Sequence, residues 1–308
     1  MDRMLTVAAY SRAELGERLA GDGIHLQTGA FVTCVKTTIG RVADGIALLY
    51  ADYPVIEQGA FADFHISLHP AGGLRRWFRP QARFDYDGMR PFKPLPLAQA
   101  FPMFEWILNW CVSSNAHRYL CIHAAVVEKD GRAVILPAPP GSGKSTLCAA
   151  LVSRGWRLLS DELTLVRLGS GELVPLPRPI SLKNASIDII RRYAPASVFS
   201  PVVDDTVKGS IAHLKAPAAS VVRAGERARA AWIIFPRYAA GASAQLEPIA
   251  PARAFMQLAE NSFNYSVLGA AGFEALAAVI EASQSYQFTY SALDDAIDIF
   301  SRLAPSTP

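Results

Sequence analysis

The sequence predicts an α/β protein in which a smaller β-rich module, residues 1–100, precedes a larger mixed core, residues 101–308. Three observations lead to this prediction. Runs rich in β-branched and aromatic residues dominate the first ninety or so positions. A glycine-rich segment in the middle of the chain separates an apolar run from a helical one. The C-terminal part carries apolar residues at helical spacing.

The composition is that of a globular protein. Hydrophobic residues make up 51% of the chain and charged residues 19%, which is too apolar for a disordered protein. The net charge is +3 without runs of like charge, which argues against nucleic acid as a partner. No apolar stretch is long enough to span a membrane, and Glu14 and Glu17 interrupt any signal-peptide core.

The spacing of the cysteines predicts a reducing, cytoplasmic compartment. They form neither a CxxC pair nor a zinc-binding spacing, which favours reduced thiols in a cytoplasmic protein. The four are Cys34, Cys111, Cys121 and Cys148.

The N-terminal module begins with a short surface helix at residues 11–21. Four strand-like runs follow, and the turn residues between them predict an antiparallel sheet. These runs are residues 31–39, 46–53, 64–70 and 76–86. Residues 92–102 are proline-rich and predict a connector, whereas residues 103–114 predict a buried helix because apolar positions cover most of its circumference.

The core begins with a predicted hairpin at residues 119–141, with Asp130 and Gly131 at its turn. A helix follows, and Gly155 is placed where a helix commonly ends in a left-handed residue. The remaining expectations are a helix at 145–154, strands at 156–168 and 230–238, a loop-rich segment at 175–217, and amphipathic helices within 251–263, 276–283 and 293–304.

The segment PAPPGSGKSTL, Pro137–Leu147, has the pattern of a phosphate-binding loop. In the pattern GxxxxGK[ST], a tight turn between a strand and a helix aims successive backbone N–H groups at phosphate oxygens. Ala138 stands where the first glycine is usual, and alanine is acceptable there if its φ is negative. Because an apolar strand precedes the loop and a helix follows it, nucleotide binding is favoured over a simple glycine-rich helix start.

Each residue of this loop has an expected role. Gly141 and Gly143 supply conformational freedom, Lys144 reaches the β- and γ-phosphates of ATP, and the Ser145 hydroxyl ligates Mg²⁺. The residues of the loop expected to bind the cofactor are Pro140, Gly141, Ser142, Gly143, Lys144, Ser145 and Thr146, and Lys208, discussed below, is the one expected from outside the loop.

Phosphoryl transfer also needs carboxylates, and Asp161 and Glu162 end the apolar run WRLLSDE. A carboxylate at the C-terminal end of a strand lies at the same sheet edge as the loop, although Ser-Asp-Glu is equally a helix or turn cap. Lys144 precedes Asp161 by only 17 residues, and His123 precedes Lys144 by 21. A lone histidine on a strand is more often a core residue than a site residue.

Taken together, IHAAVV, PPGSGKS and RGWRLLSDE resemble the HPr kinase/phosphorylase family, over roughly residues 118–166 and more weakly to about 215. The resemblance implies a core like that of HPr kinase and phosphoenolpyruvate carboxykinase. It also implies that Asp161 takes the proton from a substrate serine, that Glu162 and Ser145 hold Mg²⁺, that Lys144 neutralises the γ-phosphate, and that His123 lies beside it. Members of that family assemble into hexamers, so a homo-oligomer is possible.

A further family signature, Arg-Gly-[LI]-Gly, is matched only in part by VKGSIAHLK. Lys208 stands for the arginine and Gly209 for the hinge. Lysine keeps the charge but loses the forked geometry, so the family's reverse dephosphorylation is left open. Arg178 and Lys183 offer a second basic loop, and both loops are equally consistent with solvated surface charge. The N-terminal module does not resemble the family's usual regulatory domain, which indicates a divergent branch.

Three functions are compatible with these residues. The first is an ATP-dependent kinase acting on a serine of a small protein or peptide, as some divergent relatives do in natural-product pathways. The second is a small-molecule kinase that uses the same site. The third is a non-catalytic, nucleotide-gated binding factor, against which the complete set of charged residues argues because a pure binder needs no base.

Overall fold

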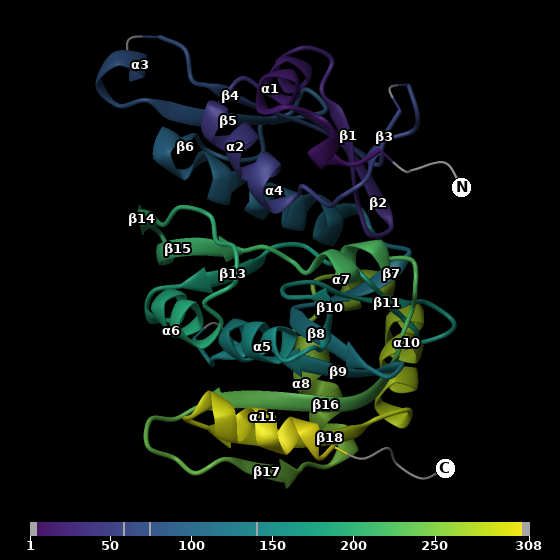
Figure 1. The fold of residues 1–308 in the computed structure, drawn as a ribbon. Helices are drawn as coiled ribbons and strands as arrows, with labels where there is room; N and C mark the ends of the chain where they lie inside the picture. Colours follow the sequence, from purple (N-terminus) through teal and green to yellow (C-terminus); the bar gives the residue numbers. More distant parts are fainter. Residues whose placement is uncertain (1–4, 58, 74, 140, 304–308) are drawn as a thin grey trace.

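The computed structural model describes residues 5–57, 59–73, 75–139 and 141–303. The protein is mixed α/β, and the described residues form two six-stranded and two three-stranded sheets. The N-terminal module lies against one end of the core (Figure 1). Within the described ranges, no helix has the length and apolarity needed to cross a membrane. All four cysteines are free and buried.

The N-terminal module is built on a mixed sheet. Across this sheet the strands are β3 (Val55–Ile56), β1 (Ile24–Thr28), β2 (Phe31–Thr37), β4 (Phe64–Pro70), β5 (Gln81–Tyr86) and β6 (Leu95–Pro96). The predictions for β2 and β4 are confirmed, but the purely antiparallel arrangement is wrong. Strands β2 and β4 pair in parallel because helix α2 (Gly40–Leu49) carries the chain back across the sheet between them.

Helix α2 also replaces the strand expected at residues 46–53. Its buried residues Val42, Ile46 and Leu49 recur at the spacing of one helix face. The helical spacing was not evident from the sequence because residues 46–53 form a nearly continuous apolar run. Gly45 has a packing reason to be glycine, because a Cβ there would lie 2.1 Å from the Phe101 ring. The glycine therefore lets α2 approach the helix that carries Phe101.

The helix expected at residues 11–21 is confirmed as α1 (Arg12–Ala20), which begins at a capping box between Ser11 and Glu14. The run 76–86 is only partly a strand, since the short helix α3 (Arg75–Phe78) precedes β5. Proline at position 80 separates the two elements.

Helix α4 (Ala100–Asn115) joins the module to the core. It begins before the predicted residue 103, and Pro102 is tolerated in its first turn because the N–H groups there have no partner within the helix. The helix packs against α2, β4 and β6. Its Glu105 carbonyl accepts a hydrogen bond from Arg178 of the core at 3.3 Å, so α4 contacts both parts of the protein.

The core is organised around the second six-stranded sheet. Across this sheet the strands are β10 (Arg157–Ser160), β8 (Ala124–Lys129), β9 (Arg132–Pro137), β16 (Arg229–Tyr238), β18 (Gln284–Tyr290) and β17 (Gln245–Pro248). The three strands β9, β16 and β18 are parallel. The hairpin between β8 and β9 is confirmed, with Asp130 and Gly131 both at positive φ.

Helices cover both faces of this sheet (Figure 1). Alternate residues of β9 pack on opposite faces of this sheet. Val134 and Leu136 belong to the hydrophobic cluster that includes α5. Ala133 and Ile135 belong to the cluster that includes α8 and α10. One face carries α5 (Lys144–Ser153) and α11 (Leu293–Ser301), and the other carries α8 (Pro251–Glu260) and α10 (Ala270–Glu281), with α9 (Tyr265–Leu268) between them in sequence.

Two runs expected as continuous strands change sheets midway. Residues 119–129 divide into β7 (Tyr119–Ile122) and β8 on either side of His123. Residues 156–168 divide into β10 and β11 (Thr164–Arg167) around residues 161–163. Strands β8 and β10 pair in the large sheet, and β7 and β11 pair in a small one completed by β12 (Leu173–Val174). Both interruptions therefore lie at one junction between sheets.

The segment 175–217, expected to be loop-rich, is largely ordered as a three-stranded sheet with one helix. Its elements are β13 (Ile180–Lys183), α6 (Ala185–Tyr193), β14 (Val203–Thr206) and β15 (Gly209–Leu214), and α7 (Ala218–Val222) follows. The prediction was wrong because these strands are too short to show a period, and β13 pairs with β15, which is distant in sequence.

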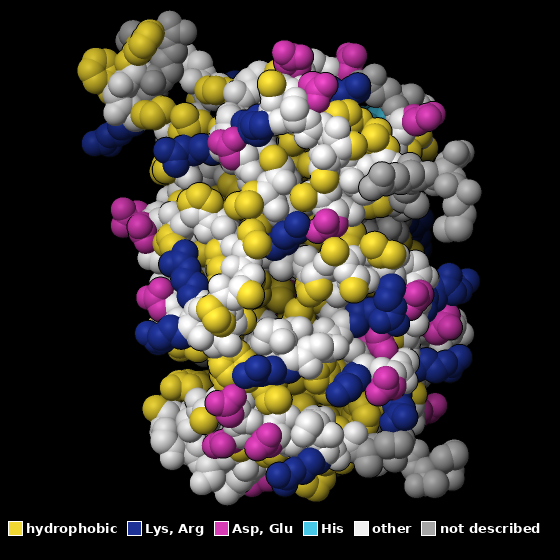
Figure 2. Space-filling view, viewed as in Figure 1, with side chains coloured by type: hydrophobic (Ala, Val, Ile, Leu, Met, Phe, Trp, Pro, Cys, Tyr) yellow, Lys and Arg dark blue, Asp and Glu magenta, His cyan; other side chains and the backbone are white. Residues whose placement is uncertain are grey.

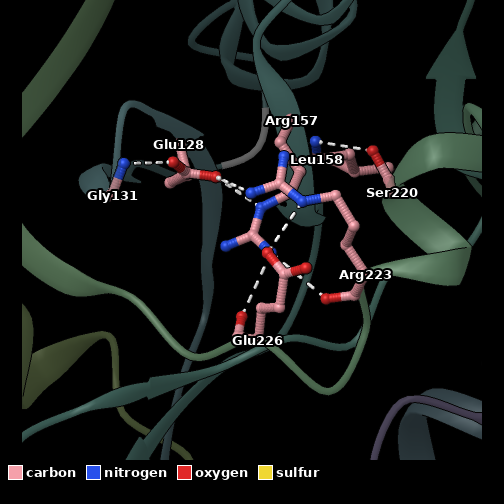
Figure 3. A network of polar contacts seen from close by, with 7 residues as sticks. All are labelled: Glu128, Gly131, Arg157, Leu158, Ser220, Arg223 and Glu226. Atoms are coloured by element: carbon pink, nitrogen blue, oxygen red, sulfur yellow. Dashed lines mark hydrogen bonds and ion pairs between the residues drawn. The ribbon is translucent and has the colours of Figure 1, made fainter.

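A buried ion pair fastens the edge strand β10 (Figure 3). Arg157 pairs with Glu128 of β8, and the two side chains are 6% and 2% exposed. The same guanidinium donates to the carbonyls of Arg223 and Glu226, both at 3.1 Å. Because Arg157 reaches both β8 and the loop after α7, it ties that loop to the sheet.

Removing one partner of this pair would leave a buried charge uncompensated. We expect Glu128→Gln to lower the free energy of unfolding by about 3 kcal/mol, measured by urea denaturation. The control is Glu226→Gln, whose side chain is 56% exposed and whose loss should cost below about 1 kcal/mol. Equal effects of the two substitutions would contradict the importance assigned to the buried pair.

Candidate functional site

The glycine-rich loop, residues 138–146, joins β9 to α5 at the C-terminal edge of the parallel strands. Neighbouring strands hold it: the Tyr238 N–H donates to the Ser142 carbonyl at 2.9 Å, and the Tyr290 hydroxyl donates to the Gly143 carbonyl at 3.0 Å. Gly141 and Gly143 have φ of +87° and +88°, a region that favours glycine. Ala138 has no positive φ and is buried, which agrees with the tolerance expected for alanine.

The loop faces a cleft of about 990 Å³. Every described residue of the predicted site lines this cleft except Asp161. Pro140, predicted as part of the loop's binding surface, lies outside the described residues. The site residues that line the cleft are His123, Gly141, Ser142, Gly143, Lys144, Ser145, Thr146, Glu162 and Lys208.

Lys144 begins helix α5 and is only 7% exposed. Its ammonium nitrogen has no hydrogen-bond partner among the described residues. Burial lowers the pKa of Lys144, and the carboxylates of Asp161 and Glu162 oppose that shift. A buried ammonium without a partner is costly, so the geometry is suited to an anion in the cleft.

Asp161 lines a smaller cavity that adjoins the cleft, since Glu162 and Ser181 line both. Its Oδ2 accepts the Ser181 N–H at 3.1 Å, whereas its buried Oδ1 has no partner among the described residues. Burial raises the pKa of Asp161, although the Lys144 ammonium opposes the shift. A side-chain hydrogen bond from Ser145 and the Ser181 N–H also favour the charged form of this carboxyl.

Glu162 is surrounded by positive charge. Burial raises the pKa of its carboxyl, but the ammonium groups of Lys144, Lys183 and Lys208 outweigh burial, and the pKa is lowered. Its Oε1 lies 3.8 Å from the Lys183 Nζ. Glu162 is thus held ionised at the wall of the cleft.

His123 lies at the junction between β7 and β8, and its backbone N–H donates to the Asn261 carbonyl at 2.7 Å. Burial, followed by the charge of Lys144, lowers the pKa of its imidazole to about 4. His123 is therefore neutral at physiological pH, and it adds no positive charge to the cleft.

Lys208 is carried by the turn between β14 and β15. The Thr206 hydroxyl braces this turn by donating to the Gly209 carbonyl at 2.6 Å and accepting from the Lys208 N–H at 3.1 Å. The ammonium lies 5.3 Å from the centre of the Trp106 ring. Gly209 has φ of +81°, and a Cβ there would lie 2.2 Å from Asn184 Oδ1, so the glycine expected as a hinge is required by geometry.

Sequence reasoning missed several residues of the cleft. Tyr193, Tyr238 and Tyr290 line its apolar part. Asn184 and Ser181 line it as well, and the Ser181 N–H donates to Asp161. On α4, Asn109 donates to Glu162 Oε2 at 3.2 Å. No local motif marks these positions, because each comes from a segment far from the loop in sequence.

The donor set fits a metal held partly by substrate. Within the described part of the chain, no group of three or more His, Cys, Asp or Glu side chains could hold a metal by itself. Ser145 and Glu162 both line the cleft. Mg²⁺ commonly binds through one or two protein oxygens together with substrate phosphates, so these two residues are adequate for it.

Comparison with known proteins gives a partial match. A family model described as SynChlorMet cassette protein ScmC matches residues 99–232, less than half of the chain. This segment contains His123, the glycine-rich loop, the Asp161–Glu162 pair and Lys208. No curated protein matches the chain.

One solved structure, the Hpr(Ser) kinase/phosphatase from Coxiella burnetii, is similar at 14% sequence identity and a TM-score of 0.27. The similarity covers 59% of this chain and 95% of that one. At this level of similarity, the function has to be argued from the residues of the cleft.

The two loop glycines should respond differently to alanine. A Cβ at Gly143 would lie 2.4 Å from the Tyr290 hydroxyl oxygen, whereas one at Gly141 would meet nothing within 4 Å. Both substitutions carry the strain of a positive φ, about 1–2 kcal/mol. We expect Gly143→Ala to lower the unfolding free energy more than Gly141→Ala in urea denaturation. An equal loss would show that the Tyr290 contact is unimportant.

Stability should also depend on pH through His213, which is 1% exposed. Burial lowers the pKa of its imidazole to about 3 from an ordinary 6.5. The unfolded chain therefore takes up a proton that the folded protein does not, and stability present above pH 6.5 is lost as the pH falls toward 3. The slope from this group is at most about 1.4 kcal/mol per pH unit.

Urea denaturation between pH 7 and pH 5 would measure this slope. We expect His213→Leu to flatten it, and the exposed His117→Leu to leave it unchanged. An identical slope in wild type and His213→Leu would contradict the assignment.

Proposed function

We propose that the protein is an ATP-dependent kinase that transfers the γ-phosphoryl group to a serine hydroxyl of a small protein or peptide. The observation that carries this proposal is the buried Lys144 ammonium, which faces a cleft without a hydrogen-bond partner among the described residues. A phosphate oxygen would supply the missing acceptor and the opposite charge.

The glycine-rich loop supports the triphosphate assignment. Its glycines, Gly141 and Gly143, adopt left-handed backbone conformations, and helix α5 begins immediately afterwards. A helix N-terminus favours phosphate through its free N–H groups and its dipole. Ser145 and Glu162 would hold Mg²⁺, which when bound would neutralise charge on the transferring phosphoryl group.

The apolar part of the cleft supports a nucleotide over a bare phosphate. Ile189, Tyr193 and Leu293 line it together with Tyr238 and Tyr290. Aromatic and aliphatic side chains of this kind bury a nucleobase and ribose more favourably than polar ones would. The cleft thus offers lysine ammonium groups as well as apolar side chains, which match the two chemically different parts of ATP.

Asp161 is the proposed base. Its raised pKa makes the carboxylate a better proton acceptor than an ordinary aspartate, and its Oδ1 has no partner among the described residues. The serine hydroxyl proton passes to Asp161 while the serine oxygen bonds to the γ-phosphorus and the bond from phosphorus to the β-bridging oxygen breaks, releasing ADP. Neutral His123 lines the cleft and can hydrogen-bond without adding charge.

The hairpin that carries Lys208 leaves room for a large phosphate acceptor. Lys208 lies on a hairpin whose neighbouring tip residue, Val207, is 88% exposed. A lysine presented on an exposed hairpin can reach the surface of a protein or peptide, which favours such an acceptor over an enclosed metabolite. We place this reaction in the cytoplasm, where ATP is available.

Two substitutions separate binding from chemistry. We expect Lys144→Ala to abolish ATP binding measured by calorimetry, because it removes the buried ammonium that begins α5 beside the glycine-rich loop. Asp161→Asn should keep ATP binding but slow transfer by about 100- to 10,000-fold, followed with γ-labelled ATP and peptides from a cell extract. Lys129→Ala, at an exposed lysine outside the cleft, is the control.

The same assay distinguishes the alternatives. Transfer by Asp161→Asn at the wild-type rate would contradict the role of that carboxylate. Label confined to low-mass metabolites would favour a small-molecule kinase. Tight ATP binding without transfer to any fraction would favour a non-catalytic binding factor.

A further inference from the structure

An amide from outside the predicted motifs contacts the Glu162 carboxylate. Asn109 lies on α4, and its Nδ2 donates to Glu162 Oε2 at 3.2 Å. The same side chain accepts a hydrogen bond at Oδ1 from Arg178 Nη2 at 2.8 Å. Because a guanidinium can only donate, Arg178 fixes the amide with its oxygen on one side and its N–H₂ group toward Glu162.

Arg178 is itself held firmly. It is 7% exposed, and its Nη2 also donates to the Glu105 carbonyl at 3.3 Å and lies 3.5 Å from Glu105 Oε2. Glu105 in turn accepts a hydrogen bond from the Tyr50 hydroxyl at 2.7 Å. The chain of contacts therefore runs from the end of α2 in the N-terminal module to the wall of the cleft.

The contact leaves Glu162 charged. A neutral amide directs a carboxylate without neutralising it, whereas a direct guanidinium partner would compete with a cation for the same oxygen. Lys183 approaches the other carboxylate oxygen only at 3.8 Å. Asn109 thus orients one carboxylate oxygen of Glu162, and the other oxygen is available to a cation.

The region between α4 and the core is closely packed. The cavity lined by Glu105, Asn109, Asp161, Glu162 and Arg178 has a volume of only about 10 Å³, roughly the space of one water molecule. A displacement of α4 would therefore move Asn109 relative to Glu162 instead of being absorbed by empty space.

We propose that Asn109, fixed by Arg178, is a positioning residue that orients the Glu162 carboxylate for the divalent cation of the phosphoryl-transfer site. The inference rests on the proposed function, because it assumes that Glu162 holds this cation. It adds that the helix joining the N-terminal module to the core completes the metal-binding side of the cleft. Partners that orient metal ligands typically contribute about 10- to 100-fold to metal affinity.

Mn²⁺ binding to the full-length protein tests this proposal, with Mn²⁺ as a paramagnetic probe and a non-hydrolysable ATP analogue in the cleft. We expect Asn109→Ala to weaken Mn²⁺ binding by about 10- to 100-fold in electron paramagnetic resonance titrations. The affinity for the analogue without metal should change by less than about twofold, because Asn109 does not line the cleft beside the loop. A merely structural role would weaken both.

Two further variants complete the experiment. Asn109→Leu keeps the branched shape of the side chain while removing the amide, and it should lose Mn²⁺ affinity like Asn109→Ala. Asn115→Ala removes the same residue type from the exposed end of the same helix and should bind Mn²⁺ as wild type does. Thermal melting identifies which variants are folded.

The outcomes separate the two proposals. Wild-type Mn²⁺ affinity in either folded Asn109 variant would overturn the positioning role while leaving the kinase proposal intact. A wild-type protein that binds neither the analogue nor Mn²⁺ would contradict the proposed function, and the positioning role with it. Loss of Mn²⁺ affinity in both variants, with analogue affinity retained, would support both proposals.

Discussion

A buried lysine at the start of α5 constrains the arrangement of the whole cleft. The Lys144 ammonium is removed from water, and the carboxylates of Asp161 and Glu162 are the charges that most oppose its loss of a proton. Each of these groups would be costly to bury without the others. The glycine-rich loop, the acidic pair and the surrounding cations therefore have to be considered as one electrostatic unit, which an anionic ligand would complete.

The junction between two sheets brings this unit together. The chain passes from the small sheet to the large one at His123 and returns at residues 161–163. A strand that changes sheets must interrupt its ladder, and the residues at the interruption are free to turn toward the loop at the edge of the parallel strands. On the face of the molecule shown in Figure 2, Lys and Arg, Asp and Glu, and hydrophobic side chains are intermixed.

The N-terminal module takes part in the site through α4. This helix packs against the module's own sheet and also carries Asn109 to Glu162. The link from Tyr50 through Glu105 and Arg178 is almost wholly buried, where hydrogen bonds are stronger and geometry is less forgiving than at the surface. A module boundary near residue 100 stays a prediction. Because α4 contacts both the N-terminal sheet and Glu162, a movement of one part would displace the other.

The sequence by itself determined the elements with a strong local signal. The glycine-rich loop, the Asp130–Gly131 hairpin, the helix after the loop and the strand at 230–238 all follow from turn chemistry and short-range periodicity. The spacing between Lys144 and the Asp161–Glu162 pair also led to their prediction as site residues. Only the tertiary structure decided that residues 46–49 are helical, that two long runs divide between sheets, and that Asn109 reaches Glu162. Those outcomes depend on burial and pairing between segments distant in sequence, and such contacts leave no pattern in the residues beside them.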